Sequence, residues 1–210
     1  MNSKPTVLLG AGGHASVLTD ILRENKQAIA GVISPVRPSS AIFSDIKLYK
    51  RDDDLAIFSV KEYAVVVAIG PQLDDRKRLN IIDMVVAKGY TLTNVLSQRA
   101  IISHYAMLGL GVQILPGAII NAGASIGQHV VINSSAVIEH DCNIGDFSHI
   151  APGAVLCGGV SVAKHVFIGA GAVVLPGVNI GSNSIIGANA LVDKDIPDNT
   201  TLYGCRGKIK

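Results

Sequence analysis

Residues 130–150 read VVINSSAVIEHDCNIGDFSHI, and within them an isoleucine recurs at every sixth position. The same step of six, continued in both directions, reaches from Ile102 to Val192 and meets only Ile, Leu or Val. These positions are Ile102, Leu108, Ile114, Ile120, Ile126, Ile132, Ile138, Ile144, Ile150, Leu156, Val162, Ile168, Val174, Ile180, Ile186 and Val192. An ordinary β-sandwich does not hold one phase over so many steps, so the stretch indicates a repeat architecture.

A second position of the repeat explains how the coil closes. Two residues before each aliphatic position the side chain is small or is valine, from Ala100 to Ala190. Residues two apart on a strand share a face, so both positions point to the interior. Three such hexads make a triangular coil of about eighteen residues, and coils must stack to bury their interior. The sequence therefore predicts a parallel β-helix over residues 98–196.

The N-terminal part has a different pattern, in which apolar strands alternate with helices. We expect strands at Thr6–Leu9, Ala28–Ile33, Tyr63–Ile69 and Thr91–Val95, helices at Ala15–Asn25 and Arg76–Lys88, and a loop over 36–54. This alternation is typical of a small parallel α/β sheet of the Rossmann-like kind. The predicted domains are thus 1–97 (α/β) and 98–196 (all-β), followed by a tail at 197–210.

A glycine-rich turn, GAGGH at residues 10–14, joins the first strand to the first helix. Backbone N–H groups at such a helix start favour phosphate groups. A nicotinamide dinucleotide is disfavoured, because Ala15 replaces the third glycine and the second strand ends at Ser34-Pro35 without an acid. The simpler alternative is that the glycines only make a tight turn.

Composition limits the remaining choices. The net charge of +2 gives no bulk reason to expect nucleic acid or an acidic membrane as partner. The three cysteines have no CxxC spacing, which favours a reducing compartment, and no signal peptide or membrane span is predicted. The expected location is the cytoplasm.

Histidines are unneeded in a regular β-helix, so they mark candidate chemistry. His140 lies between Glu139 and Asp141, and a carboxylate-oriented imidazole can act as a general base near neutral pH. For His104, His129 and His165 we favour structural or surface roles. A zinc site like that of β-helical carbonic anhydrases is disfavoured, because no two histidines here are five residues apart, and no metal is expected.

The segment from Ile138 to Ile150, together with the opening GAGGHA and the AIG at 68–70, resembles a known family over essentially the whole chain. It is similar to the left-handed β-helix acyltransferases that include sialic acid O-acetyltransferases and bacillosamine-pathway UDP-amino-sugar N-acetyltransferases. The resemblance implies a homotrimer that binds acetyl-CoA between adjacent β-helices and a nucleotide-linked amino sugar at the N-terminal domain.

The resemblance also implies residue roles. His140 matches the general base and Asp141 its acidic neighbour. Positions matching acetyl-CoA contacts are Asn133, His149, Gly158 (through its backbone N–H), Ala170 and Ala188. Positions matching the substrate-binding rim are Gly12, Gly13, His14, Ser34, Pro35 and Gly70.

The function expected from the residues and the resemblance is N-acetylation of a nucleotide-linked 4-amino-6-deoxy sugar, by direct attack on the thioester. O-acetylation of sialic acid or another sugar and a non-catalytic sugar-binding scaffold remain alternatives.

Two segments depart from the family pattern. Ser34-Pro35 replaces an acidic pair that holds the base in some members, which leaves uridine or thymidine open. The ending Cys205–Lys208 is also atypical, with Lys208 and Lys210 as candidates to bind the CoA phosphate.

Overall fold

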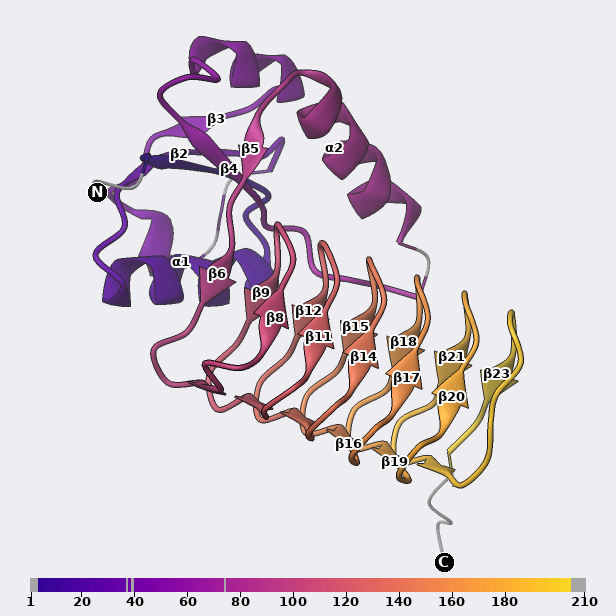
Figure 1. Cartoon of the computed structure of the whole chain (residues 1–210). Coiled ribbons are helices and arrows are strands. Elements are labelled where there is room, and N and C mark those ends of the chain that lie inside the picture. Colours follow the sequence, from indigo (N-terminus) through magenta and orange to yellow (C-terminus); the bar gives the residue numbers. More distant parts are fainter. Residues whose placement is uncertain (1–3, 37, 39, 74, 205–210) are drawn as a thin grey trace, which may run out of the picture. The chain divides into compact units, whose positions relative to one another are not determined.

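The chain divides into two compact units, Met1–Val95 and Leu96–Lys210 (Figure 1). The computed structural model describes residues 4–36, 38, 40–73 and 75–204. The first unit is an α/β sheet and the second is a stack of short parallel strands, so the predicted fold class is confirmed. The atypical segment Cys205–Lys210, with Lys208 and Lys210, lies outside the described residues.

The α/β unit is a five-stranded parallel sheet with the order β3-β2-β1-β4-β5. Its strands are β1 (Thr6–Leu9), β2 (Ile29–Ile33), β3 (Leu48–Tyr49), β4 (Ala64–Val67) and β5 (Thr91–Leu92). Its helices are α1 (Gly13–Glu24) and α2 (Arg76–Ala87), with 3-10 turns η1 (Ala41–Phe43) and η2 (Asp52–Ile57). The order reverses direction between β1 and β4, and ligands of such sheets bind at the carboxyl ends of the strands beside this switch.

The burial of the central strands β1 and β4 explains why the sequence predicts them. All residues of β1 and β4 are buried, as expected for strands covered on both faces. Helix α1 turns Ala15, Leu18 and Leu22 toward the core and leaves its other face in solvent.

Two sequence predictions in this unit are wrong. The strand expected at Thr91–Val95 ends at Leu92, and Val95 begins β6 (Val95–Leu96), which belongs to the β-helix. Leu96 lies six residues before Ile102, so the hexad repeat starts one step earlier than expected. The loop expected over 36–54 contains η1, the edge strand β3 and the first turn of η2, because a two-residue strand is too short to give an alternating pattern.

The β-helix consists of three parallel sheets, here numbered 1 to 3. Sheet 1 contains β7 (Ile101–Ile102), β10 (Ile119–Ile120), β13 (Val137–Ile138), β16 (Val155–Leu156), β19 (Val173–Val174) and β22 (Leu191–Val192). Sheet 2 contains β8 (Met107–Leu108), β11 (Ser125–Ile126), β14 (Asn143–Ile144), β17 (Ser161–Val162) and β20 (Asn179–Ile180). Sheet 3 contains β6, β9 (Gln113–Ile114), β12 (Val131–Ile132), β15 (His149–Ile150), β18 (Phe167–Ile168), β21 (Ile185–Ile186) and β23 (Thr201–Leu202).

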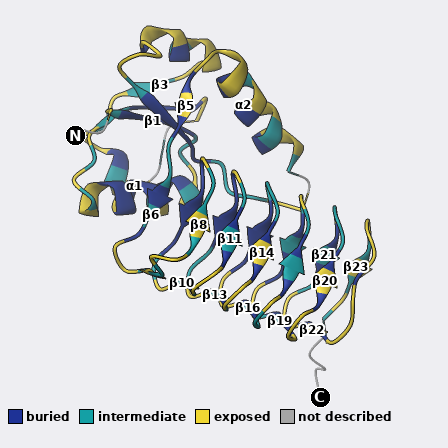
Figure 2. Ribbon diagram, in the orientation of Figure 1, coloured by how far each residue is buried: buried dark blue, intermediate teal, exposed yellow. Residues whose placement is uncertain are grey.

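Each strand pairs with the strand three hexads later, as Ile120 pairs with Ile138 and Ile138 with Leu156. The second residue of each strand points inward and joins one continuous core. Figure 2 colours the ribbon by burial. The last coil is shorter, because Ile186 pairs with Leu202 rather than with a residue eighteen positions on. The predicted three-hexad coil is therefore confirmed up to this coil.

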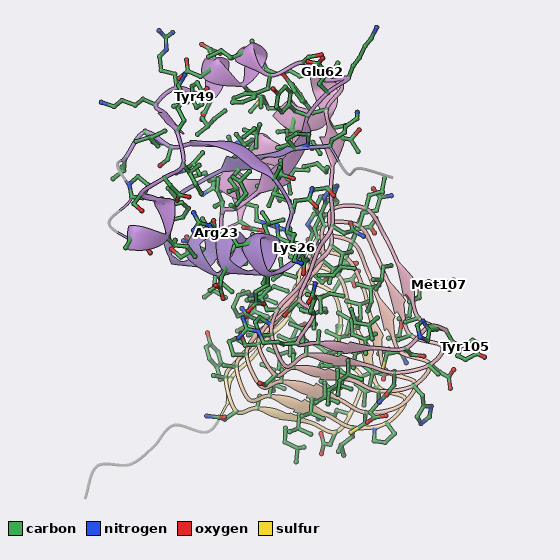
Figure 3. All side chains as sticks on the ribbon, turned by 90° about the vertical axis from the view of Figure 1, so that its left-hand side faces the viewer. Arg23, Lys26, Tyr49, Glu62, Tyr105 and Met107 are labelled. Atoms are coloured by element: carbon green, nitrogen blue, oxygen red, sulfur yellow. The ribbon has the colours of Figure 1, made fainter. Side chains whose placement is uncertain are left out.

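The outward-facing residues differ sharply between sheets 1 and 2. The outward column of sheet 1 is wholly aliphatic: Ile101, Ile119, Val137, Val155, Val173 and Leu191. The outward column of sheet 2 is polar after its first residue: Met107, Ser125, Asn143, Ser161 and Asn179. Met107 is 65% exposed and projects outward near Tyr105, which is 81% exposed (Figure 3). Sheet 1 is thus the face suited to burial against another protein surface.

The described part of the chain has no helix that is both long and apolar enough to cross a membrane.

Candidate active site

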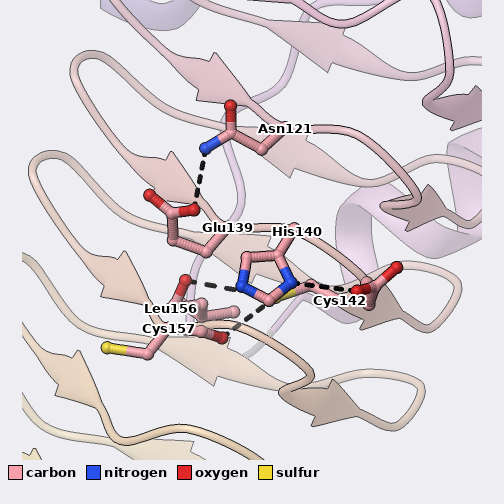
Figure 4. Close-up of polar contacts among 7 residues, drawn as sticks. Asn121, Glu139, His140, Cys142, Leu156 and Cys157 are labelled. Atoms are coloured by element: carbon pink, nitrogen blue, oxygen red, sulfur yellow. Dashed lines mark hydrogen bonds and ion pairs between the residues drawn. The ribbon is translucent and has the colours of Figure 1, made fainter.

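His140 and Asp141 lie in the turn between β13 of sheet 1 and β14 of sheet 2. Asp141 adopts a left-handed backbone conformation, with φ of 60°, which Asp tolerates better than most residues. His140 Nδ1–H donates to Asp141 Oδ2 over 2.9 Å (Figure 4). Because a carboxylate can only accept, this bond fixes the tautomer in which Nε2 carries the lone pair. Nε2 is therefore the nitrogen able to take a proton.

The surroundings of His140 strengthen it as a base. The hydrogen bond from His140 to Asp141 is the main cause that raises the pKa of His140, and the negative charges of Asp141 and Glu139 act in the same direction. Glu139 is itself held by Asn121, whose Nδ2 donates to Glu139 Oε2 over 2.9 Å (Figure 4). The His140 side chain is 65% exposed, so a substrate can reach it.

Small residues make room for the imidazole. The residues one coil before and one coil after His140 are Ala122 and Gly158. A Cβ placed on Gly158 would lie 2.5 Å from His140 Nε2, with no closer heavy atom. Gly158 does not adopt a left-handed φ, so its backbone does not require glycine. The glycine instead leaves space for the ring of His140.

Four of the five residues expected to contact acetyl-CoA, all except Gly158, lie at or beside a second corner of the β-helix. Asn133 Nδ2 lies 3.2 Å from His149 Nε2, and the His149 ring meets Phe167 edge-on at 4.8 Å. Ala170 and Ala188 follow β18 and β21, one coil apart, in the turns between sheets 3 and 1. Asn133, Ala170 and Ala188 thus share a corner, and His149 lies on the adjoining strand.

His140 and His149 belong to the same coil of the repeat, but within one chain they lie at different corners. His140, Asp141 and Gly158 occupy the corner between sheets 1 and 2. The Asn133 corner lies between sheets 3 and 1. The aliphatic column of sheet 1 runs between the two corners.

Cys142, two residues after His140, is not suited to nucleophilic attack. Cys142 is 1% exposed and its thiol donates to the Cys157 carbonyl oxygen over 3.2 Å (Figure 4). Burial raises the pKa of the Cys142 thiol, which disfavours the thiolate. This agrees with the direct transfer expected from the sequence.

The other β-helix histidines lie away from His140 in the repeat. The ring of Phe147 stacks on His129 and on His165, each at 5.0 Å, one coil before and after it. His104 is exposed and lies two coils before His140 in the same column. Among the described residues, no group of three or more His, Cys, Asp or Glu is arranged to hold a metal ion.

The α/β unit carries a pocket of about 600 Å³ at the carboxyl ends of β1, β2 and β4. All six residues predicted for the substrate-binding rim line it: Gly12, Gly13, His14, Ser34, Pro35 and Gly70. Asp52 and Lys77 also line it, and the sequence interpretation missed both. The only available signal for Asp52 was its position just after an edge strand that was itself missed.

The glycines of this pocket are there for different reasons. Gly10 has φ of +115°, and a Cβ there would lie 2.9 Å from the Ala68 carbonyl oxygen, so the turn itself requires glycine. Gly12 and Gly13 have no left-handed φ, and a Cβ added at either would meet nothing within 4 Å. Helix α1 begins at Gly13 with no side-chain hydrogen bond from its N-cap residue Gly12, so that residue's side chain satisfies none of its first N–H groups. That combination fits an anionic ligand at the helix start.

Comparisons with known proteins give one matching family model for each of the two units. The family model described as "PglD N-terminal domain" matches residues 6–85. The model described as "Bacterial transferase hexapeptide (six repeats)" matches residues 123–158 and 159–194. A search of curated proteins finds no match.

One similar structure is that of the perosamine N-acetyltransferase PerB from Caulobacter crescentus, solved with CoA and GDP-perosamine. The two chains are 34% identical, with 98% of this chain and 97% of that chain covered and a TM-score of 0.86. The chain belongs to the left-handed β-helix sugar N-acetyltransferases. The acetyltransferase domain of PglB from Neisseria gonorrhoeae, solved with acetyl coenzyme A, is 27% identical, with 96% and 97% coverage and a TM-score of 0.87.

Membership of this sugar N-acetyltransferase family confirms the resemblance found from the EHD segment and the GAGGHA turn. It also confirms an enzyme that uses an acyl-CoA co-substrate, and thereby sets aside the non-catalytic scaffold.

Proposed function

We propose that this enzyme transfers the acetyl group of acetyl-CoA to the amine of a nucleotide-linked 4-amino-6-deoxy sugar used in surface glycan or glycoprotein biosynthesis. The observation that carries the proposal is the His140–Asp141 pair, with Nδ1–H fixed on the carboxylate and Nε2 left as the base. The GDP-perosamine complex of PerB supports an amino sugar as acceptor.

The chemistry follows from the geometry of the His140 corner. The sugar amine attacks the thioester carbon, and His140 Nε2 takes the proton that the nitrogen loses. The Gly158 N–H, which donates to no backbone carbonyl among the described residues, can donate to the developing oxyanion. The C–S bond then breaks, and the imidazolium returns its proton to the CoA thiolate. Asp141 stabilises the imidazolium throughout.

The two units divide the ligands between them in this proposal. Residues 1–97 bind the nucleotide sugar, with Gly12, Gly13 and His14 at the diphosphate and with Ser34, Pro35 and Gly70 on the rim. Residues 98–196 bind acetyl-CoA, with contacts from Asn133, His149, Ala170 and Ala188, and the tail 197–210 follows.

A homotrimer completes the site. The aliphatic column of sheet 1 lies between the His140 corner and the Asn133 corner, so a neighbouring copy packed beside this sheet brings one corner from each chain together. Burial of apolar surface supplies the driving force. Acetyl-CoA and nucleotide sugars are cytoplasmic metabolites, and the free thiols of Cys142 and Cys157 fit a reducing compartment, so we place the enzyme in the cytoplasm.

The test is acetyl transfer by the purified enzyme. Acetyl-CoA is supplied with GDP-, UDP- or dTDP-linked 4-amino-6-deoxy sugars or with sialic acid, and release of the CoA thiol is followed by absorbance. Thiol release with a nucleotide-linked amino sugar, and an amide in the product by mass spectrometry and NMR, are expected. Turnover with sialic acid alone would overturn the proposal.

A further inference from the structure

The residue that follows each strand of sheet 1 points outward, beside the corner that carries His140. From the first strand of the sheet to the last, this column reads Ser103, Asn121, Glu139, Cys157, Leu175 and Asp193. The N–H of Glu139 donates to the Leu156 carbonyl and that of Cys157 to the Val174 carbonyl, so the column stays in register with the strands. Successive members therefore lie about 4.8 Å apart, the spacing of paired strands.

The polarity of this column changes between Glu139 and Cys157. Before the change, Asn121 Nδ2 donates to Glu139 Oε2 over 2.9 Å. After it come Cys157, a half-buried free cysteine, and Leu175, which is 36% exposed. A free cysteine packs as a small apolar group, so the column is polar up to the coil of His140 and apolar over the next two coils.

The basic nitrogen of His140 lies on the apolar side of this change. Its Nε2 atom is 2.5 Å from the position that a Cβ would take on Gly158, so the ring leans toward the coil of Cys157. Figure 4 shows the same arrangement, with the imidazole between Glu139 and Cys157. In the proposed reaction the thioester oxygen accepts from the Gly158 N–H, so the thioester carbon lies beside Cys157 and not beside Glu139.

The two sides of Gly158 are left for the alkyl group and the sulfur of the thioester. On one side are Gly159 and Gly177, where an added Cβ would meet no atom closer than 4.0 Å, so this side is open to the long CoA arm. On the other side are Cys157 and Leu175, whose apolar side chains suit the alkyl group.

Resting on the proposed function, we infer that Cys157 and Leu175 bind the alkyl part of the acyl group and that Leu175 limits its length. The methyl group of acetyl-CoA contacts Cys157. A longer chain is not stabilised on the side of Glu139 and Asn121, which are polar and bonded to each other, so it extends toward Leu175, one coil further on. The Leu175 side chain occupies that space, and the enzyme therefore prefers acetyl-CoA to butyryl-CoA.

The decisive variant is Leu175→Ala, which removes the side chain at the far end of this acyl site. Calorimetry without acceptor measures the binding of acetyl-CoA and butyryl-CoA, and thiol release with the amino sugar gives kcat/KM for each. The parent enzyme is expected to favour acetyl-CoA. Leu175→Ala is expected to shift the ratio of the two toward butyryl-CoA about 10- to 200-fold, the discrimination that apolar pockets achieve. Leu110→Ala is the matched control, since Leu110 is an exposed leucine at the corner between sheets 2 and 3.

Cys157→Leu tests the near end of the acyl site in the opposite direction. The larger side chain fills the place of the acetyl methyl group, so acetyl-CoA binding should weaken about tenfold or more, while CoA, which has no acyl group, binds as before.

Four results would each overturn the inference: no preference of the parent enzyme for acetyl-CoA, an unchanged ratio in Leu175→Ala, an equal shift in Leu110→Ala, or equal losses of CoA and acetyl-CoA binding in Cys157→Leu. Thioester binding is measured without acceptor. Acyl-length selection by Leu175 in an enzyme that acetylates no nucleotide-linked sugar would therefore contradict only the proposed function.

Discussion

The two units of this enzyme differ in how their candidate functional sites are built from side chains. In the β-helix a strict repeat defines every position, and the candidate catalytic residues are side chains that depart from it, such as His140 and Asp141. In the α/β unit the pocket depends on side chains that are missing, at Gly10, Gly12 and Gly13. We therefore expect function in the β-helix to be lost mainly when a substitution removes a side-chain group. In the α/β unit we expect it to be lost mainly when a substitution adds a side chain.

The largest effect is expected from His140→Ala. Loss of a general base should reduce kcat about 10²- to 10⁴-fold with little change in thermal unfolding, because the side chain is mostly exposed. Steady-state thiol release measures it. His104→Ala is the matched control, since His104 occupies the same column of the repeat and is exposed; a similar loss there would contradict the special role of His140.

The second effect concerns the faces of the β-helix. Val155→Lys places a charge in the middle of the aliphatic column of sheet 1, where burial of an unpaired ammonium is costly. We expect dissociation of the proposed trimer, seen by light scattering, and loss of most of the acetyl transfer. Ser161→Lys, at the equivalent strand position on sheet 2, should leave both unchanged. A trimer that survives Val155→Lys would show that sheet 1 is not the interface.

Gly158→Ala tests whether an added side chain can disable the β-helix site. The three heavy atoms nearest to the new Cβ all belong to the His140 imidazole, which must move. Displacement of a catalytic group by about 1 Å can cost roughly 10²-fold in rate, while the melting temperature should stay nearly constant. In the His140→Ala background the substitution should have no further effect on rate. An additional loss there would show that the added Cβ disturbs the site in another way than by displacing the His140 ring.

The sequence predicted the β-helix well because each coil repeats the same packing problem, so one register determines the strands from Ile101 to Val192. The pairing of His140 with Asp141 followed from their adjacency. Two features depended on tertiary structure that no local pattern reveals. Asp52 reaches the pocket only because β3 adds to the sheet edge, and the separation of His140 from His149 follows from which sheet each strand joins.

Gly10→Ala and Gly12→Ala separate stability from binding in the α/β unit. Alanine at Gly10 must hold a φ of +115° and approach the Ala68 carbonyl, so unfolding should become easier by about 1–3 kcal/mol. Alanine at Gly12 meets no neighbour, so stability should hold while affinity for the nucleotide falls. Denaturant unfolding and calorimetry measure the two effects. Equal destabilisation by both variants would show that Gly12 is needed for the turn itself and not for nucleotide binding.

The smallest effect, and the most informative about mechanism, is expected from Asp141→Asn. Only neutral His140 can act as a base, so activity falls as pH drops through its pKa, which Asp141 raises above the ordinary value. Replacing the carboxylate by an amide lowers that pKa, so the acid limb of the kcat/KM profile should move to lower pH. The plateau rate should fall on the order of tenfold, about 1.4 kcal/mol, because a weaker base takes the proton. A limb that stays in place while the plateau falls would mean that Asp141 orients the ring without changing its basicity.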